Sequence, residues 1–218
     1  MMLMNEHGLI WMLFLVLLSF VLGLLRGTHR KINQENSGEA LVRRKLIKYC
    51  RSTSSHVLNN ITIPLDDGTT QIDHVLVTNH GILVIETKHY SGWIFANDRH
   101  KVWTQVKFKL KNKFQNPIFQ NYKHLMAVRR MFDFLPEEYI QSLVVFTGEA
   151  EFRTDMPTGV IYVSDLEKYV NSMSFGVISE NRVQFCVGRL ECKRMELTNQ
   201  TDIEHQAYLD KKFGRVDE

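Results

Sequence analysis

Apolar and polar positions divide the chain into an apolar N-terminal segment and a longer region with helical and extended periodicity. Residues 9–25 contain no charged side chain, and at about 1.5 Å per helical residue they would span about 26 Å, close to the thickness of a bilayer core. We expect a transmembrane helix there, preceded by a short tail over residues 1–8. A cleaved secretory signal is the alternative, but its apolar part usually ends in small residues rather than in Leu24, Leu25 and Arg26.

Positive charges follow this apolar segment. Arg26, Arg30 and Lys31 come after it, whereas residues 1–8 contain neither lysine nor arginine. Cytoplasmic flanks of membrane spans carry an excess of Lys and Arg, so we expect a single-pass membrane protein whose bulk faces the cytoplasm. Residues 26–35 are polar and predict a short linker.

The pattern beyond the linker predicts an α/β fold. Apolar residues at helical spacing predict a first helix, with Asn36 or Ser37 as its N-cap. Three runs rich in β-branched residues then predict antiparallel strands, because Asp-Asp-Gly and Asn-His-Gly turns separate them. These runs are residues 57–65, 71–78 and 81–88.

The rest of the chain continues this mixture of elements. Residues 103–114 alternate like a single strand, and Asn116-Pro117 then opens a helix that ends before Pro136. Two apolar strands and three helices follow, at residues 142–148, 159–165, 165–173, 182–190 and 201–213. We expect a mixed central sheet flanked by helices, with a core at residues 36–149 that residues 150–218 complete.

Composition adds little to this picture. The 218 residues are 44% hydrophobic, which suffices for one domain with a core, and a net charge of +3 does not by itself indicate a nucleic-acid partner. The three cysteines lack a CxxC spacing and favour a reducing compartment over a disulfide framework.

Charged residues interrupt two of the apolar strands. Asp73 lies in QIDHVLVT, and Glu86 and Lys88 lie in GILVIETK. If His80 and Gly81 form a two-residue loop, Asp73 pairs with Lys88 and all three charged side chains share one face of the sheet. A one-residue change in loop length would separate them. The alternative is that both acids are solvated at strand ends and that Glu86 and Lys88 form a weak surface pair.

Two carboxylates side by side in an apolar strand pair need a partner. At an effective dielectric constant near 20, their repulsion is on the order of 4 kcal/mol at 4 Å, and one lysine offsets only part of it. A hard divalent cation would neutralise both acids, and Mg²⁺ accepts carboxylate oxygens together with water and phosphate oxygens. The pattern therefore predicts a metal site at Asp73 and Glu86.

An aspartate in one strand and Glu-x-Lys in the next, after a helix with a glutamate, resembles the PD-(D/E)xK nuclease superfamily. GEALV, QIDHVLV, GILVIETKHYSGWI, Trp103 and QNPIFQNYKH together resemble the nuclease-related domain, NERD, over residues 37–135. The resemblance implies a restriction-endonuclease-like fold and metal-dependent hydrolysis of DNA. Ile72 stands where the superfamily has a proline, which is the NERD pattern.

The resemblance also implies roles for individual residues. Asp73 and Glu86 would bind Mg²⁺ or Mn²⁺ together with the backbone carbonyl of Thr87. Lys88 would position or help deprotonate the attacking water and stabilise the charge that develops on phosphorus. Gln120 matches a glutamine that some branches of the superfamily place beside the lysine.

Four further positions near the predicted site have a structural alternative. Glu39 matches the first-helix glutamate that touches the metal directly or through water, but it would equally complete a capping box with Asn36. His74, His89 and His124 show no zinc-ligand spacing, so we expect them at core or surface positions.

Lysines recur at every second position of residues 107–113. One extended strand would place Phe108 and Leu110 in the core and align four lysines along one edge. These are Lys107, Lys109, Lys111 and Lys113. Four phosphate contacts on duplex DNA would give a slope of about −3.6 for log affinity against log salt. A lysine-guarded edge strand that prevents aggregation explains the same pattern.

We therefore expect a membrane-anchored, cytoplasm-facing nuclease whose partners are DNA and, through residues 9–25, a lipid bilayer. The first alternative is a non-catalytic nucleic-acid- or protein-binding module on the same fold. The second is a membrane scaffold whose span is the functional part.

Overall fold

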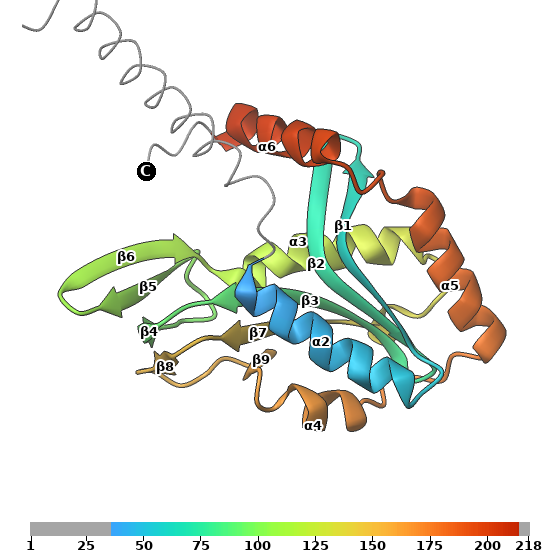
Figure 1. The fold of residues 1–218 in the computed structure, drawn as a ribbon, viewed down its shortest axis with the longest axis horizontal. Coiled ribbons are helices and arrows are strands. Elements are labelled where there is room, and N and C mark those ends of the chain that lie inside the picture. The colour runs from blue at the N-terminus through green and yellow to red at the C-terminus, as the bar shows by residue number, and fades with distance from the viewer. Residues whose placement is uncertain (1–35, 214–218) are drawn as a thin grey trace, which may run out of the picture. The chain divides into compact units, whose positions relative to one another are not determined.

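A five-stranded mixed sheet forms the centre of the computed structural model, which describes residues 36–213 (Figure 1). Its strands lie in the order β1-β2-β3-β7-β9. Neighbours among β1, β2 and β3 are antiparallel, whereas β7 and β9 continue the sheet in parallel with β3. The strands are β1 at His56–Leu65, β2 at Gly68–Thr78, β3 at Gly81–His89, β7 at Ile140–Thr147 and β9 at Val160–Tyr162. The predicted mixed sheet and its three antiparallel strands are confirmed.

The chain divides between Glu35 and Asn36, and the residues from Asn36 onward form one compact unit. The predicted tail (1–8), transmembrane helix (9–25) and linker (26–35) lie outside the described residues. Within residues 36–213, no helix is both long enough and apolar enough to cross a membrane.

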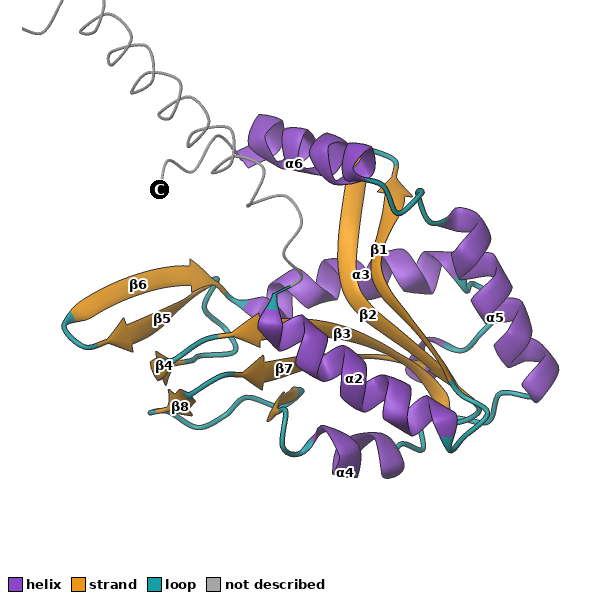
Figure 2. Cartoon of the chain, in the orientation of Figure 1, coloured by secondary structure: helices purple, strands orange, loops and turns teal. Residues whose placement is uncertain are grey.

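Helices cover both faces of the five-stranded sheet (Figure 2). α2 and α4 pack on one face, and α3 and α5 pack on the other, while α6 contacts β2. The helices are α2 at Ser37–Arg51, α3 at Pro117–Met131, α4 at Leu166–Asn171, α5 at Glu180–Lys193 and α6 at Asn199–Phe213, with a short 3₁₀ helix, η1, at Glu137–Tyr139.

Polar caps start the two helices that reach the predicted site. The side chain of Asn36 accepts a hydrogen bond from the N–H of Gly38, so Asn36 rather than Ser37 caps α2. Asn116 accepts in the same way from Ile118 at the start of α3. Pro117 occupies the first turn of α3, where a missing N–H leaves no bond unmade.

Side chains of β2 and β3 alternate between two apolar layers. Val75 and Val84 pack with α3 and α5, whereas Leu76 and Leu83 pack with α2 and α4. Because these strands are covered on both sides, their apolar runs are continuous rather than alternating. Val75 and Val77 of β2 and the even positions of β3 face α3, and Ile72 belongs to the same cluster, so the alternation of β2 is interrupted between Ile72 and Val75.

A second sheet of four strands, in the order β6-β5-β4-β8, extends beyond one end of the first (Figure 1). The strands are β4 at Gly92–Phe95, β5 at Val102–Lys107, β6 at Leu110–Gln115 and β8 at Ala150–Phe152. Ile94 and Trp103 pack against Val144 and Phe146 of β7, and this apolar cluster joins the two sheets.

The prediction of one strand over residues 103–114 is wrong, because the chain reverses at Phe108 and Lys109 and forms the hairpin of β5 and β6. Phe108 is 92% exposed and Leu110 is 68% exposed, so neither reaches the core. The turn was not visible in the sequence because it contains no Gly, Asn or Pro. Phe108 itself adopts a φ of 56°, which L residues rarely take.

Candidate metal and nuclease site

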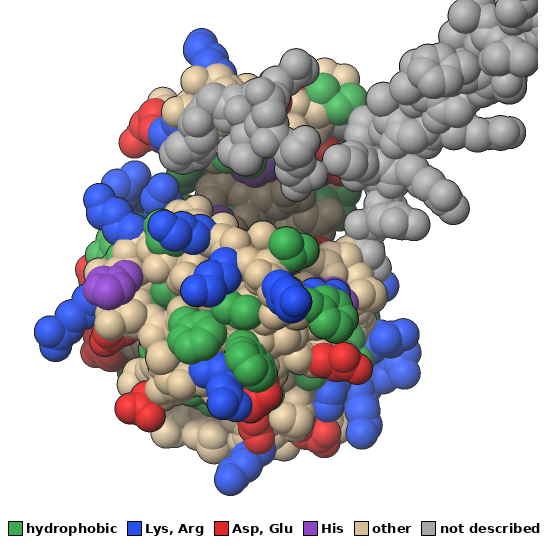
Figure 3. All heavy atoms as spheres, turned by 90° about the vertical axis from the view of Figure 1, so that its left-hand side faces the viewer, with side chains coloured by type: hydrophobic (Ala, Val, Ile, Leu, Met, Phe, Trp, Pro, Cys, Tyr) green, Lys and Arg blue, Asp and Glu red, His purple; other side chains and the backbone are tan. Residues whose placement is uncertain are grey.

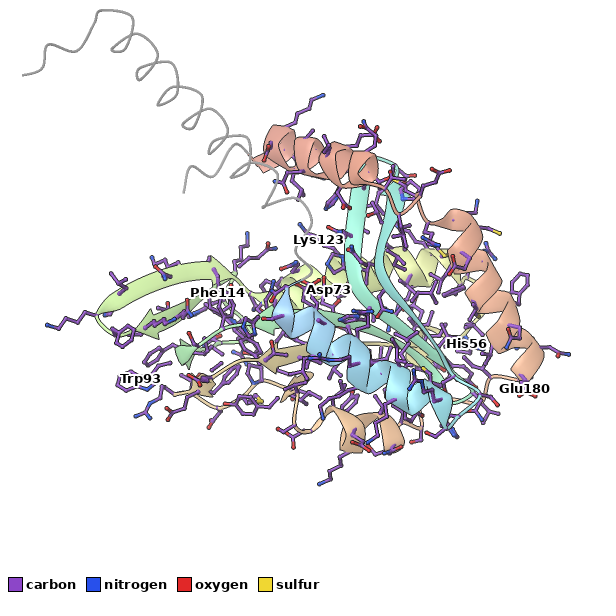
Figure 4. All side chains as sticks on the ribbon, in the orientation of Figure 1. His56, Asp73, Trp93, Phe114, Lys123 and Glu180 are labelled. Carbon is purple, nitrogen blue, oxygen red and sulfur yellow. The ribbon has the colours of Figure 1, made fainter. Side chains whose placement is uncertain are left out.

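Asp73 and Glu86 face each other across the strand pair β2 and β3. The ladder of paired residues ends at His74 and Ile85, one position before Asp73 and Glu86, and the two carboxyl groups are close enough for the charge of Glu86 to raise the pKa of Asp73. Glu86 is buried and Asp73 is half-buried. Figure 4 labels Asp73, which comes from the middle of the long strand β2.

The predicted register is wrong by two residues. The turn consists of Asn79 and His80 rather than His80 and Gly81, so Asp73 does not lie opposite Lys88. Because side chains alternate with a period of two, a shift of two residues keeps the acids and Lys88 on one face. The shared face on which the predicted site depends is therefore retained.

Four side chains meet on this face. Lys88 Nζ lies 2.7 Å from Glu86 Oε1 and donates a hydrogen bond of 2.9 Å to Gln120 Oε1. The backbone N–H of Thr87 donates a hydrogen bond of 2.7 Å to Asp73 Oδ2. β2, β3 and α3 thus each contribute to one constellation, and the lysine side chain is held at both sides.

Charges in the site shift the pKa values of its members. Burial and the charges of Glu86 and Glu39 raise the pKa of Asp73 well above its ordinary value. Burial would also raise the pKa of Glu86, but His124 and Lys88 outweigh burial and lower it. Burial would lower the pKa of Lys88, but the attraction of Glu86 outweighs burial and raises it. The site holds an ion pair beside an aspartate whose charge is disfavoured.

Sequence reasoning placed His124 at a core or surface position and missed its contact with the acids. His124 is buried, its Nε2 lies 3.3 Å from Glu86 Oε2, and its Nδ1 lies 2.7 Å from Thr70 Oγ1. The signal was present in the spacing, because residues four apart on a helix lie on one side of it, and Gln120 and His124 have that spacing.

A second missed residue, Asn121, fixes α3 against the sheet. Its side chain is fully buried, and its Nδ2 lies 3.0 Å from the carbonyl oxygens of both Val84 and Leu143. Asn121 thereby joins α3 to β3 and β7, next to the helix position that carries Gln120. No feature of the sequence distinguished Asn121 from an exposed polar residue of an amphipathic helix.

The predicted row of four lysines is not formed. Lys111 and Lys113 alternate on β6 and share one face of the four-stranded sheet. Lys107 pairs with Leu110, so Lys107 lies on the opposite face, and Lys109 is in the turn. The row fails because the hairpin reverses the chain in its middle.

The donor atoms of the site suit a hard cation. Among residues 36–213, no three His, Cys, Asp or Glu side chains are arranged to hold a metal ion. Asp73 and Glu86 therefore form a two-carboxylate set, which Mg²⁺ completes with backbone, water and substrate oxygens. Glu86 Oε2 is buried, and His124 Nε2 lies 3.3 Å from it, so His124 orients the oxygen that would bind the cation.

Comparison with known proteins places this geometry in a family context. Residues 34–147 match the family described as the nuclease-related domain. An uncharacterized protein of Bacillus anthracis, pXO1-01, is 32% identical over 186 residues, which cover 82% of this chain and 85% of that protein. No solved structure matches the chain. The mixed sheet flanked by helices is consistent with a restriction-endonuclease-like fold.

Proposed function

The chain belongs to the nuclease-related domain family, and from that premise we propose that it is a metal-dependent deoxyribonuclease that hydrolyses phosphodiester bonds in DNA. One observation carries the proposal, namely the convergence of Asp73, Glu86, Lys88 and Gln120 at one position. Two neighbouring carboxylates reduce stability unless something neutralises them. Such an arrangement is typical of a site that binds a cation.

Asp73 and Glu86 would hold Mg²⁺ or Mn²⁺, and the carbonyl of Thr87 would be a further ligand. The bound ion would polarise the scissile phosphate and lower the pKa of a coordinated water. The negative charge of Glu86 helps to raise the pKa of Asp73 in the absence of an ion. With an ion bound, both carboxylates would be deprotonated ligands and their charges would attract it.

Lys88 would act on the water and on the phosphate. It is an ammonium in this arrangement, because its attraction to Glu86 raises its pKa. Its hydrogen bond to Gln120 fixes the ammonium before DNA arrives, and a fixed ammonium stabilises the negative charge that develops on phosphate oxygens. If Glu86 bound the cation, its attraction for the ammonium would weaken and the pKa of Lys88 would fall; Lys88 would first have to release its own proton to solvent before its amine could accept one from the attacking water.

Gln120 and Glu39 would support the site in different ways. Gln120 would position Lys88 through the hydrogen bond between them. Glu39, in the first turn of α2, adds negative charge whose repulsion Asp73 senses, and the same field would attract a divalent cation.

We also propose that residues 9–25 anchor the protein in a membrane, with residues 36–218 in the cytoplasm. The uncharged stretch and the basic residues after it support this orientation. Protease added to intact spheroplasts should leave a C-terminal tag on the protein uncut, and should cut it after lysis. Loss of the tag from intact spheroplasts would contradict the orientation.

Cleavage by the full-length chain in detergent tests the proposed chemistry. Linear, circular, single-stranded and branched DNA should be offered with Mg²⁺, with Mn²⁺ and with EDTA. Cutting should require the metal, and Asp73→Ala and Lys88→Ala should each reduce it by at least about a hundredfold. Asp66→Ala and Lys168→Ala, at exposed positions, are matched controls and should cut like the wild type.

Equal cutting by the wild type and both site variants would assign the activity to a contaminant or to another site. DNA binding that is unaffected by EDTA, without any cleavage, would instead favour a non-catalytic binding module on the same fold.

A further inference from the structure

The four-stranded sheet has one covered face and one open face. Ile94 and Trp103 are buried on the covered face, whereas Trp93 is 47% exposed and Phe95 is 39% exposed on the open face. Figure 3 views this end of the molecule and shows hydrophobic side chains near its centre with Lys and Arg side chains around them. Large aromatic side chains that are exposed together mark a surface that binds something.

Aromatic and cationic side chains on the open face are aligned in two rows. Cross-strand partners share a face, so the pairing of β4 with β5 and of β5 with β6 defines which side chains are neighbours. The rows are Trp93, Val106 and Lys111 in one, and Phe95, Thr104 and Lys113 in the next. Each row crosses three strands and is about 10 Å long, and the rows are about 7 Å apart. Each row therefore offers a ring at one end and an ammonium at the other.

One more cation lies beside the first row. The guanidinium of Arg153 lies 4.9 Å from the ring centre of Trp93 and also pairs with Glu151, at 2.6 Å. Glu151 is the β8 partner of Trp93 and is the acid of this row. Because Arg153 neutralises Glu151, the two lysines leave the platform with a positive charge.

The chain connects this sheet directly to the proposed active site. Residues 92–115, which form β4, β5 and β6, lie between Lys88 and Gln120 in the sequence. The side chains of Lys88 and Gln120 are themselves hydrogen-bonded at 2.9 Å. The chain therefore enters β4 shortly after Lys88 and leaves β6 shortly before Gln120, and Figure 4 shows Trp93 toward the outer end of this sheet.

We propose that the open face, which we call the stacking platform (Trp93, Phe95, Lys111, Lys113), binds single-stranded DNA and presents it to the proposed nuclease site. The two rings stack on two successive bases, and the two lysines contact the phosphates of those nucleotides. This inference rests on the proposed nuclease function and adds the substrate class, which is DNA with unpaired bases.

Single-stranded DNA fits this surface better than a duplex or a lipid surface does. Aromatic rings stack on base faces, and a duplex hides those faces, so the rings would gain nothing from paired DNA. An anionic membrane would be met by a protruding apolar tip or by a scattered basic patch. The exposed Phe108 at the turn between β5 and β6 is such a tip, but it lies outside the platform. The rings of the platform instead share a sheet face with a lysine two strands away from each ring.

Fluorescence anisotropy in EDTA tests binding without cleavage. The full-length chain in detergent is titrated with a labelled oligothymidylate of about 12 nucleotides, and with a duplex of equal length. The single strand should bind at least about tenfold more tightly than the duplex. Trp93→Ala combined with Phe95→Ala should weaken binding of the single strand at least about tenfold, while Trp93→Phe should retain most of it.

A matched pair of charge variants tests the placement of the lysines. Lys111→Gln with Lys113→Gln should reduce the slope of log affinity against log salt by about 1.4 for a single strand. Lys107→Gln with Lys109→Gln removes the same charge from the other face and from the turn, and should change affinity less than about twofold. Circular dichroism of each variant should match the wild type, since every substituted side chain is exposed.

Three outcomes would overturn the stacking platform: tighter binding of the duplex, unchanged binding after loss of both rings, or an equal effect of the two lysine pairs. Binding to phosphatidylglycerol vesicles that requires the rings, without binding to the oligonucleotide, would make the face a lipid contact instead. The proposed nuclease function fails separately. If the wild type binds single strands but cuts no DNA, the stacking platform is supported and the proposed nuclease function is contradicted. If loss of both rings leaves cutting unchanged, the nuclease function is supported and the platform is contradicted.

Discussion

The two sheets place charged and aromatic side chains in opposite environments. In the five-stranded sheet, Asp73 and Glu86 interrupt strands that helices cover on both faces. In the four-stranded sheet, Trp93 and Phe95 are exposed on a face that no helix within residues 36–213 covers. Acids are seldom buried and large rings are seldom exposed together, so each sheet departs from the usual preference at one place. The proposed metal site thus lies in the five-stranded sheet and the proposed DNA-binding surface lies on the four-stranded sheet, and one apolar cluster joins the two sheets.

Trp103 lies in the apolar cluster that joins the two sheets, in contrast to Trp93 on the same sheet. Trp103 is 1% exposed, and its ring packs against Phe146 of the first sheet and Phe114 of the hairpin. Its Nε1 donates to the carbonyl of Asn97. Trp103 therefore stabilises the fold, whereas Trp93 belongs to the proposed DNA-binding surface. Substituting each tryptophan separately distinguishes an effect on stability from an effect on DNA binding.

Replacing Trp103 with alanine should give the largest loss of stability, about 3 to 5 kcal/mol, because it empties the cluster that joins the sheets. Trp93→Ala should cost less than about 1 kcal/mol, because that ring is half-exposed. Urea denaturation followed by circular dichroism measures both values. Equal losses at the two positions would mean that the open face is not open in solution.

The contact between His124 and Glu86 should matter next. His124→Ala should lower metal-dependent cleavage about 10- to 100-fold and raise the Mg²⁺ concentration for half-maximal activity, because Glu86 loses a group that orients its second oxygen. Tyr122→Ala, at an exposed position of the same helix, is the control and should leave both values unchanged. A fall in activity with an unchanged Mg²⁺ requirement would contradict a role of His124 in positioning the ligand.

The smallest effect should be a gain in stability. Asp73→Asn removes one of two repelling charges and keeps an acceptor for the Thr87 N–H, so in EDTA at neutral pH it should stabilise the protein by about 1 to 3 kcal/mol. The folded-state pKa of Asp73 is raised, so the folded wild type binds the proton first and gains stability as the pH falls.

The difference in thermal midpoint between Asp73→Asn and the wild type should therefore shrink from neutral pH toward pH 4. A difference that is constant with pH would show that the folded protein does not raise the pKa of Asp73, through burial or through the charge of Glu86. Adding Mg²⁺ should reverse the order, because only the wild type retains both ligands.

The sequence allowed more to be predicted for the first sheet than for the second. The shared face of Asp73, Glu86 and Lys88 was predictable although the register was not, because a shift of two residues preserves side-chain alternation. The hairpin of β5 and β6 was not predictable, since Phe108 adopts a left-handed conformation at a position where turn residues were expected. That one turn separates Lys111 and Lys113 from the other two lysines.

By itself, the sequence determined the family, the order of the main elements and the acids and lysine of the candidate site. These follow from local periodicity, from caps and from motifs whose members lie within a few residues of each other. Only the tertiary structure brought His124 to Glu86, joined Trp103 to the first sheet and opened one face of the second. Each of these depends on contacts between residues far apart in the chain, and the packing of layers rather than local spacing decides them.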